Sequence, residues 1–366
     1  MAGCLAQLHG KDVASELPEA DLFVGTSDIP GISDTIRRAG AKGIRMSVSK
    51  DLRYIYNEDS PRYRFTPRHW AYVKVSEGCS NFCSYCIISR LRGQFRSRPM
   101  PSVIEEVKKI SSDGYLREIE LIGQDTTAFG IDRYGKMMFP ELLRRLARLK
   151  NGIEWIRILY THPRHYTDEL IETIRNEHKI CKYLDLPIQH ISDRVLKRMN
   201  RKTSRKDIID LIERLRSRIP GLVLRTSIIV GFPGETEKDF KDLLKFVRET
   251  EFERLGAFIY SAEEGTAALR LGGQVHEKVR TARFDELMKL QKRISSGLNK
   301  RVVGQTVKVL IDEKVKGEKD EFMGRTEGDA PEVDGTVYVS GKGLKVGQFY
   351  DVSITGSTEY DLIGQV

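Results

Sequence analysis

The sequence predicts an α/β protein in which a partial (β/α)6-type barrel of parallel strands is followed by a small all-β barrel and preceded by an α/β fragment. Strand-like runs alternate with amphipathic, helix-period segments from Trp70 to about Lys300. Short alternating runs punctuated by glycine follow Arg301. The length of 366 residues fits two or three domains at roughly 150 residues each. We therefore expect domains at 1–60, 65–300 and 301–366.

The first sixty residues predict too little structure for a core of their own. An apolar run at 21–26 indicates a strand, and 31–40 indicates a short helix closed by glycine. A polar stretch rich in Tyr and Arg, 51–69, indicates a linker. We expect the chain to begin partway through a domain.

The central region contains six strand–helix units in succession. One helix is expected to start at the N-cap Ser204 and to end at Pro220-Gly221. Such a repeat predicts a parallel sheet with right-handed crossovers, either a barrel or part of one. The expected strands are 71–75, 118–122, 155–159, 183–186, 223–230 and 255–259.

The region after Arg301 differs from the rest in pattern and in charge. Its five short runs predict a small β-barrel. Residues 302–366 carry seven Lys/Arg and twelve Asp/Glu, a net charge of −5, so the preceding chain carries +14 of the total of +9. An acidic module thus follows a basic body.

Composition excludes several classes of protein. The chain is 40% hydrophobic and 31% charged, as expected for a soluble globular protein and not for a disordered one. No run approaches the ~20 apolar residues of a membrane span. The start, MAGCLAQLHG, lacks the order of a signal peptide, so we expect a cytoplasmic location and no membrane partner.

Three of the five cysteines lie within eight residues, in the segment SEGCSNFCSYCIISR directly after the first central strand. Cys79, Cys83 and Cys86 have the spacing Cys-x3-Cys-x2-Cys. Three thiolates can hold three irons of a 4Fe-4S cluster and leave the fourth iron open. A structural zinc site needs four closed ligands, and no fourth Cys or His lies nearby in sequence. A reduced trio without metal is the remaining alternative.

This spacing, with Tyr85 before the last cysteine, resembles that of the radical S-adenosylmethionine (SAM) enzymes. The resemblance implies that the open iron binds the amino and carboxylate groups of SAM. One electron then cleaves the sulfonium to give a 5′-deoxyadenosyl radical. It also implies that Tyr85 packs near the adenine, although simple packing within the loop would explain the residue too.

Further motifs resemble those of the methylthiotransferases, and the match spans essentially the whole chain. These enzymes insert sulfur into a C–H bond and methylate it, and their terminal barrel is a TRAM domain. The motifs are LIGQDTTAFG (121–130), LDLPIQHISDRVLKRMNR (184–201), RTSIIVGFPGET (225–236) and YSAEEGTAA (260–268).

Candidate cofactor-binding residues stand where strands are expected to end or begin. Gln124 follows the second strand, where its amide could bind the polar end of SAM or cap the next helix. Gln189 and His190 follow the fourth strand, and a histidine there can equally be structural. Arg225 begins the fifth strand. Gly231 lies in the turn after it, where it could permit close approach to adenosine or serve the turn alone.

Cys4 lies in a Gly-Cys-Leu context like that of the last of three N-terminal cysteines that hold a second 4Fe-4S cluster in methylthiotransferases. The other two are not among these 366 residues. The resemblance thus implies that Cys4 is an auxiliary-cluster ligand only in a full-length protein that supplies its partners. Without them it is an inert thiol.

The methylthiotransferases have two branches with different substrates. One modifies adenosine in tRNA. The other modifies the β-carbon of an aspartate in small-subunit ribosomal protein number twelve. The segment 324–339 resembles the ribosomal-protein branch, and an acidic barrel suits a basic protein partner better than RNA. We therefore expect Asp329, Glu332 and Asp334 to dock this protein, although the +14 body would tolerate tRNA.

Two further expectations concern partners and class. An electron donor such as flavodoxin or ferredoxin is implied by the radical chemistry. A non-catalytic binding protein built on the terminal barrel is the remaining alternative. The complete cysteine trio argues against it, because a binding module needs no cluster with an open iron.

Overall fold

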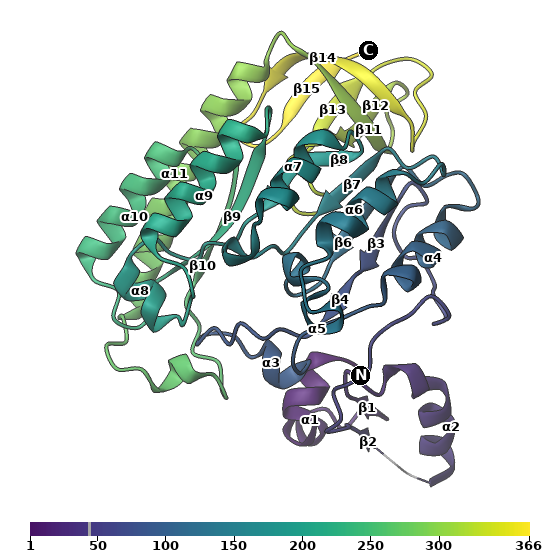
Figure 1. The fold of residues 1–366 in the computed structure, drawn as a ribbon, viewed down its shortest axis with the longest axis vertical. Helices are drawn as coiled ribbons and strands as arrows, with labels where there is room; N and C mark the ends of the chain where they lie inside the picture. The colour runs from purple at the N-terminus through teal and green to yellow at the C-terminus, as the bar shows by residue number, and fades with distance from the viewer. Residues whose placement is uncertain (43–44) are drawn as a thin grey trace.

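A computed structural model describes residues 1–42 and 45–366, which form an N-terminal unit, a parallel α/β sheet and a terminal β-barrel (Figure 1). The N-terminal unit holds a two-stranded parallel sheet, in which Phe23 pairs with Met46. The helix α1 was not predicted from the sequence. The unit's elements are α1 (Cys4–Glu16), β1 (Phe23–Val24), the 3-10 turn η1 (Ile29–Gly31), α2 (Ile32–Lys42) and β2 (Met46–Ser47).

The central sheet has six parallel strands in the spatial order β10-β9-β8-β7-β6-β3. Strands from consecutive strand–helix units are therefore adjacent in the sheet. This confirms the predicted (β/α)6-type partial barrel. The predicted strand positions agree with the observed ones to within a few residues. The strands are β3 (Trp70–Lys74), β6 (Glu118–Ile122), β7 (Trp155–Ile158), β8 (Ile180–Asp185), β9 (Val223–Val230) and β10 (Arg254–Ile259).

Helices cover one face of this sheet. The helix predicted from Ser204 begins there with a capping box, in which Ser204 and Asp207 bond each other's backbone N–H, and it ends at Arg218. The longer helices are α4 (Met100–Ser111), α6 (Phe139–Ala147), α7 (Asp168–Asn176), α9 (Arg205–Arg218), α10 (Glu237–Thr250) and α11 (Glu277–Val302). The short elements are β4 (Ser76–Glu77), α3 (Ile88–Leu91), β5 (Arg96–Ser97), η2 (Thr126–Ala128), α5 (Ile131–Tyr134), η3 (Pro163–His165), α8 (Asp193–Arg198) and η4 (Ala267–Arg270).

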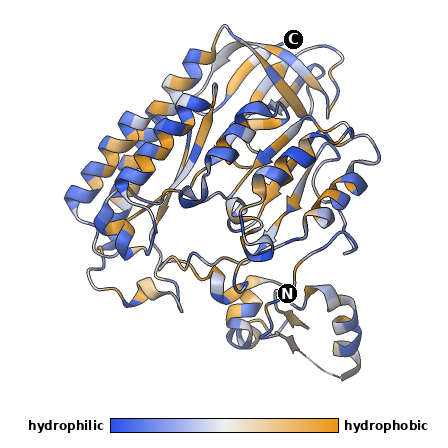
Figure 2. Cartoon of the chain, in the orientation of Figure 1, coloured by the Kyte–Doolittle hydropathy of each residue, from blue (hydrophilic) through white to orange (hydrophobic). Residues whose placement is uncertain are grey.

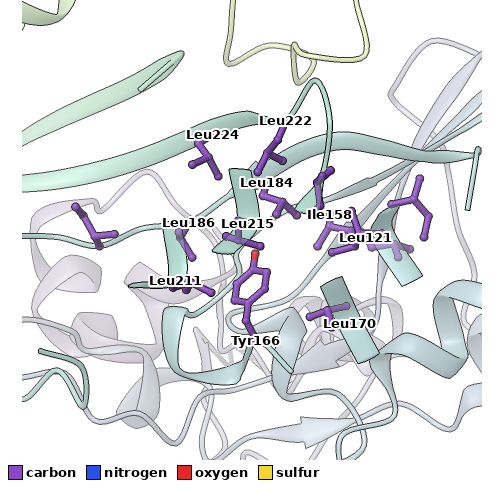
Figure 3. Close-up of a cluster of buried hydrophobic side chains, with 14 of the residues drawn as sticks. Leu121, Ile158, Tyr166, Leu170, Leu184, Leu186, Leu211, Leu215, Leu222 and Leu224 are labelled. Atoms are coloured by element: carbon purple, nitrogen blue, oxygen red, sulfur yellow. The ribbon is translucent and has the colours of Figure 1, made fainter. Parts of the chain in front are cut away.

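The main core lies between the sheet and its helices. Figure 2 shows helices α9, α10 and α11 with mixed hydrophilic and hydrophobic surfaces, as expected for helices that bury one side. The buried leucines and isoleucines come from consecutive strands and the facing helices. Figure 3 shows this layer, with Leu121, Ile158, Leu184 and Leu224 from four strands and Tyr166, Leu170, Leu211 and Leu215 from the covering segments.

The terminal barrel is closed, with the strand order β11-β12-β13-β15-β14. It has its own small core, which includes Val309, Val339 and Ile354. Figure 1 shows it at the end of the sheet opposite to β4 and α3. All five strands were predicted from the alternating runs: β11 (Thr306–Lys314), β12 (Glu321–Arg325), β13 (Val337–Ser340), β14 (Phe349–Ser357) and β15 (Leu362–Gln365).

The terminal barrel packs against the other face of the sheet, and buried charged side chains lie between the two. Arg157 on β7 and Glu118 on β6 are fully buried, with Nε and Oε1 2.8 Å apart. Arg325 of the terminal barrel reaches Glu118 at 2.9 Å and Asp312 at 2.7 Å. These contacts form a buried ionic junction, defined here as Glu118, Glu120, Arg157, Asp312 and Arg325. This junction was not predicted from the sequence.

No helix in the described part of the chain is both long and apolar enough to cross a bilayer.

Candidate functional site

The cysteine loop, residues 78–87, follows β3 and β4 at the carboxyl edge of the parallel sheet. Gly78 opens it with a φ of +75°, and a Cβ there would lie 2.3 Å from the Gln94 carbonyl oxygen, so only glycine fits. The Cys86 N–H donates to the Cys83 carbonyl at 3.0 Å. Ligands of open parallel sheets bind at this edge. The sequence thus places three thiols where a cofactor is expected.

The three thiols of the cysteine loop are partly buried and free of disulfide bonds. Within the described residues, their sulfur atoms are not among the groups whose ligand atoms all lie within 4.8 Å of one another. Burial raises the pKa of Cys79 to about 11 and also raises the pKa of Cys86. Cys79 and Cys86 therefore hold their protons at neutral pH, and metal binding must release them.

Buried polar atoms without partners gather around the cysteine loop. Gln124 Oε1, His162 Nε2 and Arg201 Nε are buried and make no hydrogen bond in the described structure. Unpaired polar groups of this kind are rare in native interiors, where a ligand or an ordered water normally satisfies them. These atoms therefore fit a polar cofactor such as SAM beside an iron–sulfur cluster. The next residue, Asp125, caps η2, so Gln124 does not have the capping role that was its alternative.

Sequence reasoning missed a polar chain beside Cys79. The Asn81 amide donates to Cys79 Sγ at 3.4 Å and to Asp125 Oδ2 at 2.8 Å. His165 Nδ1 lies 2.9 Å from the same carboxylate oxygen. Burial opposes the charge of Asp125, but His165 outweighs it and lowers the pKa of Asp125 to about 2. The signal in the sequence was Asp125 within the motif LIGQDTTAFG, directly after the second strand.

His162 gives the first testable consequence, a dependence of stability on pH. Burial and the charge of Arg201 lower its pKa to about 3, so the folded protein keeps the ring neutral where the unfolded chain protonates it. Stability is therefore lost as pH falls below about 6.5, by about 2 kcal/mol at pH 5. In urea unfolding at pH 7.5 and pH 5, His162→Gln is expected to lose about 2 kcal/mol less than wild type. An identical loss in both proteins would contradict this.

Tyr85 is half-buried and meets Phe232 edge-on, with ring centroids 6.4 Å apart. It also packs against a small cluster that contains Met199 and Tyr260. The protein itself therefore supplies part of its surroundings. A place for Tyr85 beside adenine stays a prediction.

Gln189 and His190 have different environments. Gln189 adopts a left-handed φ of 70° and remains partly exposed, so its position near the cofactor stays a prediction. His190 is fully buried, accepts from the Ser192 N–H at 2.9 Å and has Nε2 3.8 Å from Glu235. It is a structural histidine and does not line the site.

Arg225 and Gly231 both have partners within the protein, and their expected cofactor-binding roles stay predictions. Arg225 lies 2.9 Å from Asp185 and 3.5 Å from Asp334 of the terminal barrel. Gly231 donates its N–H to Glu235 at 2.7 Å, and a Cβ there would collide with Arg280. Its φ of +70° explains the glycine without a ligand.

Two of the three expected docking acids of the terminal barrel are paired with groups of the sheet. Asp329 is 2% exposed and pairs with Arg254 at 2.6 Å. Asp334 accepts from the Tyr183 hydroxyl at 2.7 Å and faces Arg225. Both carboxylates are buried against the sheet, which argues against a docking role for them; that role stays an untested prediction. Glu332 is exposed and stays available.

Cys4 opens α1, and its sulfur accepts from Arg92 Nη2 at 3.4 Å. Arg92 also pairs with Glu77, the residue before the cysteine loop, at 3.1 Å. Figure 1 shows the N-terminal unit beside α3, at the same end of the sheet as this loop. The fold therefore brings Cys4 to the side of the molecule that holds the cysteine trio.

Comparison with known proteins gives matches for both modules and for the whole chain. Residues 73–247 match the model of the radical SAM superfamily, and residues 303–366 match the TRAM domain. The chain is 48% identical over 368 residues to the ribosomal protein uS12 methylthiotransferase RimO of Clostridioides difficile, which covers 100% of this chain and 82% of that protein. RimO of Desulfitobacterium hafniense is 46% identical, over 100% and 81%.

A solved structure shares the fold at low identity. The cobalamin-dependent SAM radical enzyme OxsB matches with a TM-score of 0.52 at 11% identity, over 80% of this chain and 43% of that one.

Proposed function

Because the chain belongs to the family of ribosomal protein uS12 methylthiotransferases, we propose that it adds a methylthio group to the β-carbon of an aspartate in uS12, small-subunit ribosomal protein number twelve. One observation carries this proposal: the likeness to these enzymes runs over the entire chain and includes the cysteine loop and the terminal barrel. The chain is thus a transferase of the radical SAM type.

We propose that Cys79, Cys83 and Cys86 hold a 4Fe-4S cluster whose fourth iron binds SAM. When bound, the cluster supplies the electron that cleaves SAM and starts the radical chemistry. We expect Gln124 to offer its buried acceptor oxygen to the cofactor and Tyr85 and Gln189 to lie near the cofactor. The substrate aspartate must reach this edge, where Phe82 of the cysteine loop is 54% exposed.

The docking of uS12 is proposed at the carboxyl edge of the sheet and not on the outer surface of the terminal barrel. That barrel lies at the opposite end of the sheet in Figure 1, and Asp329 and Asp334 are already paired with cations of the body. Flavodoxin or ferredoxin is the proposed class of electron donor, because the cluster needs a one-electron reductant.

A second cluster is proposed for a protein that supplies two more N-terminal cysteines, with Cys4 as the one ligand from these 366 residues. Iron binding tests this part. The 366-residue chain, reconstituted anaerobically, is expected to hold about four irons, because it contains one complete cysteine set. Iron and acid-labile sulfide analysis measures this value. About eight irons per chain would contradict the proposal that Cys4 needs partners from outside these residues.

The function is tested by mass spectrometry of uS12 and of tRNA from cells that lack the gene. We expect uS12 to lose its methylthio group and tRNA to keep its own. Complementation with the full-length gene should restore the modification, and complementation with its Cys83→Ala form should not. If tRNA instead lost its methylthioadenosine while uS12 kept its methylthio group, the result would support the tRNA branch.

A further inference from the structure

The segment 61–68, which leads into β3, turns its aromatic side chains outward and its arginines inward. Tyr63 and Phe65 are 80% and 91% exposed, whereas Arg62 and Arg64, which alternate with them, are partly buried. Apolar side chains normally take the buried side of such an alternation. The segment therefore presents two aromatic rings to solvent, where they contribute nothing to a core.

The arginines hold the segment in this orientation. Arg62 pairs with Glu106 of α4 and donates to the Tyr72 carbonyl at 2.6 Å. Arg64 lies 3.8 Å from Asp113, which follows the same helix. The two exposed rings lie edge-on to each other, with centroids 4.9 Å apart. Because one side of the alternation is fixed by polar contacts, the rings on the other side stay on the surface.

A third aromatic ring and two further arginines extend this surface. Arg68 pairs with Asp113 at 3.2 Å, and its guanidinium lies over the ring of Tyr115, 3.7 Å from the centroid. Tyr115 is 54% exposed. Arg117 donates to the Gly114 carbonyl at 2.7 Å, and a carbonyl does not cancel its charge. The aromatic patch is defined here as Tyr63, Arg64, Phe65, Arg68, Tyr115 and Arg117.

The chemistry of the aromatic patch fits an anionic partner with flat, unpaired rings. Its three arginines are accompanied by one carboxylate, that of Asp113, so positive charge is in excess. Unpaired bases of RNA stack on exposed Tyr and Phe rings and on guanidinium planes, and arginines also contact the phosphates. A basic ribosomal protein would be repelled by the same charge. The patch therefore favours RNA over the protein substrate.

We propose that the aromatic patch binds a single-stranded segment of the ribosomal RNA of the small subunit. The binding of single-stranded RNA goes beyond the proposed function, and only the choice of ribosomal RNA rests on it, because uS12 belongs to that subunit. The patch lies at the amino ends of β3 and β6, which run parallel, whereas the cysteine loop follows the carboxyl end of β3. RNA bound there leaves the cysteine loop free to receive the aspartate of uS12.

The test is a titration of the 366-residue chain with a fluorescein-labelled oligouridylate of about 12 nucleotides, followed by fluorescence anisotropy. Tyr63→Ala/Phe65→Ala is expected to bind about tenfold more weakly than wild type, or weaker still, because the stacked bases lose their rings. Tyr63→Phe/Phe65→Tyr keeps both rings and should bind like wild type. The matched control, Tyr338→Ala/Tyr360→Ala, removes two rings of the terminal barrel that are 42% and 45% exposed, and it should not change binding.

Three results of this titration would overturn the inference. They are a wild type that does not bind the single strand, a Tyr63→Ala/Phe65→Ala variant that binds it like wild type, and an RNA duplex of the same length that binds as tightly. Arg68→Ala supplies a second variant in case the double variant does not fold. It should bind the single strand more weakly and with a shallower dependence on salt, because one phosphate contact is lost. Unchanged binding would equally overturn the inference.

Sedimentation with isolated small ribosomal subunits and, separately, with tRNA tests the source of the RNA. Tyr63→Ala/Phe65→Ala is expected to bind the subunits more weakly than wild type does. Weaker binding of tRNA alone would overturn the choice of ribosomal RNA. A wild-type dimer that the double variant does not form would assign the patch to a second copy of the chain and overturn the inference. None of these measurements needs iron or SAM, so a failure of the proposed function, seen as uS12 that keeps its methylthio group in cells without the gene, is a separate result.

Discussion

Replacement of Cys83 by alanine is expected to abolish the formation of 5′-deoxyadenosine from SAM by the reconstituted chain. The proposed cluster has three protein ligands, and removal of the middle one leaves too few to hold it. The loop itself should keep its conformation, because Ser84 is anchored through its N–H and its hydroxyl, and Phe82 through its carbonyl, without the Cys83 thiol. Chromatographic measurement of 5′-deoxyadenosine under reducing, anaerobic conditions gives the readout.

Cys181→Ala is the matched control for this variant. Cys181 is a fully buried thiol on β8, packed with Trp155 and Tyr183, and it lies outside the cysteine loop. Its replacement is expected to leave the formation of 5′-deoxyadenosine in place. Wild-type amounts of product from Cys83→Ala would remove the basis for placing the cluster on this loop.

Replacement of Arg157 by methionine is expected to destabilise the protein by about 3–5 kcal/mol. Arg157 and Glu118 are both fully buried, and the Arg157 side chain also donates to the Glu327 carbonyl of the terminal barrel. Burial and the charge of Glu118 raise the pKa of Glu120 well above its usual range, so Glu120 is protonated and Glu118 carries the negative charge. Removal of Arg157 leaves that charge with Arg325 alone.

An exposed ion pair across the same two modules supplies the comparison. Lys308 and Glu154 lie 2.6 Å apart, with 48% and 46% of their side chains exposed. Lys308→Ala should cost at most about 1 kcal/mol, because water screens the pair. Urea unfolding followed by circular dichroism compares the two variants with wild type. A loss below 1 kcal/mol for Arg157→Met would mean that the junction contributes little.

The fold was predictable to the extent that local patterns decide it. The strand β9 shows the period-2 alternation of a strand, with every second residue buried, and Ser204 marks the start of its helix through a capping box. The helix α1 was missed because only Ala6 and Gly10 are buried along it, so it shows no continuous apolar face.

The site was predictable where residues stand close together in the sequence. The cysteine spacing identified the loop, but Arg201 reaches Cys83 across 118 positions, a contact that no single motif reveals. The net charge of the terminal barrel was a poor guide to the docking surface for a related reason. The acids Asp329 and Asp334 face the half-buried Arg254 and Arg225, and composition does not distinguish a carboxylate on the surface from one between two modules.

The buried ionic junction has a consequence for protein engineering. A chimaera that joins this radical SAM body to the TRAM barrel of another enzyme would bring Glu118 and Arg157 against a foreign surface. Unless that barrel carries equivalents of Arg325 and Asp312, the graft leaves charges sealed inside without counterions. The terminal barrel therefore cannot simply be exchanged for that of another enzyme. Libraries of hybrids should take the residues at positions 118, 157, 312 and 325 together from the same parent enzyme.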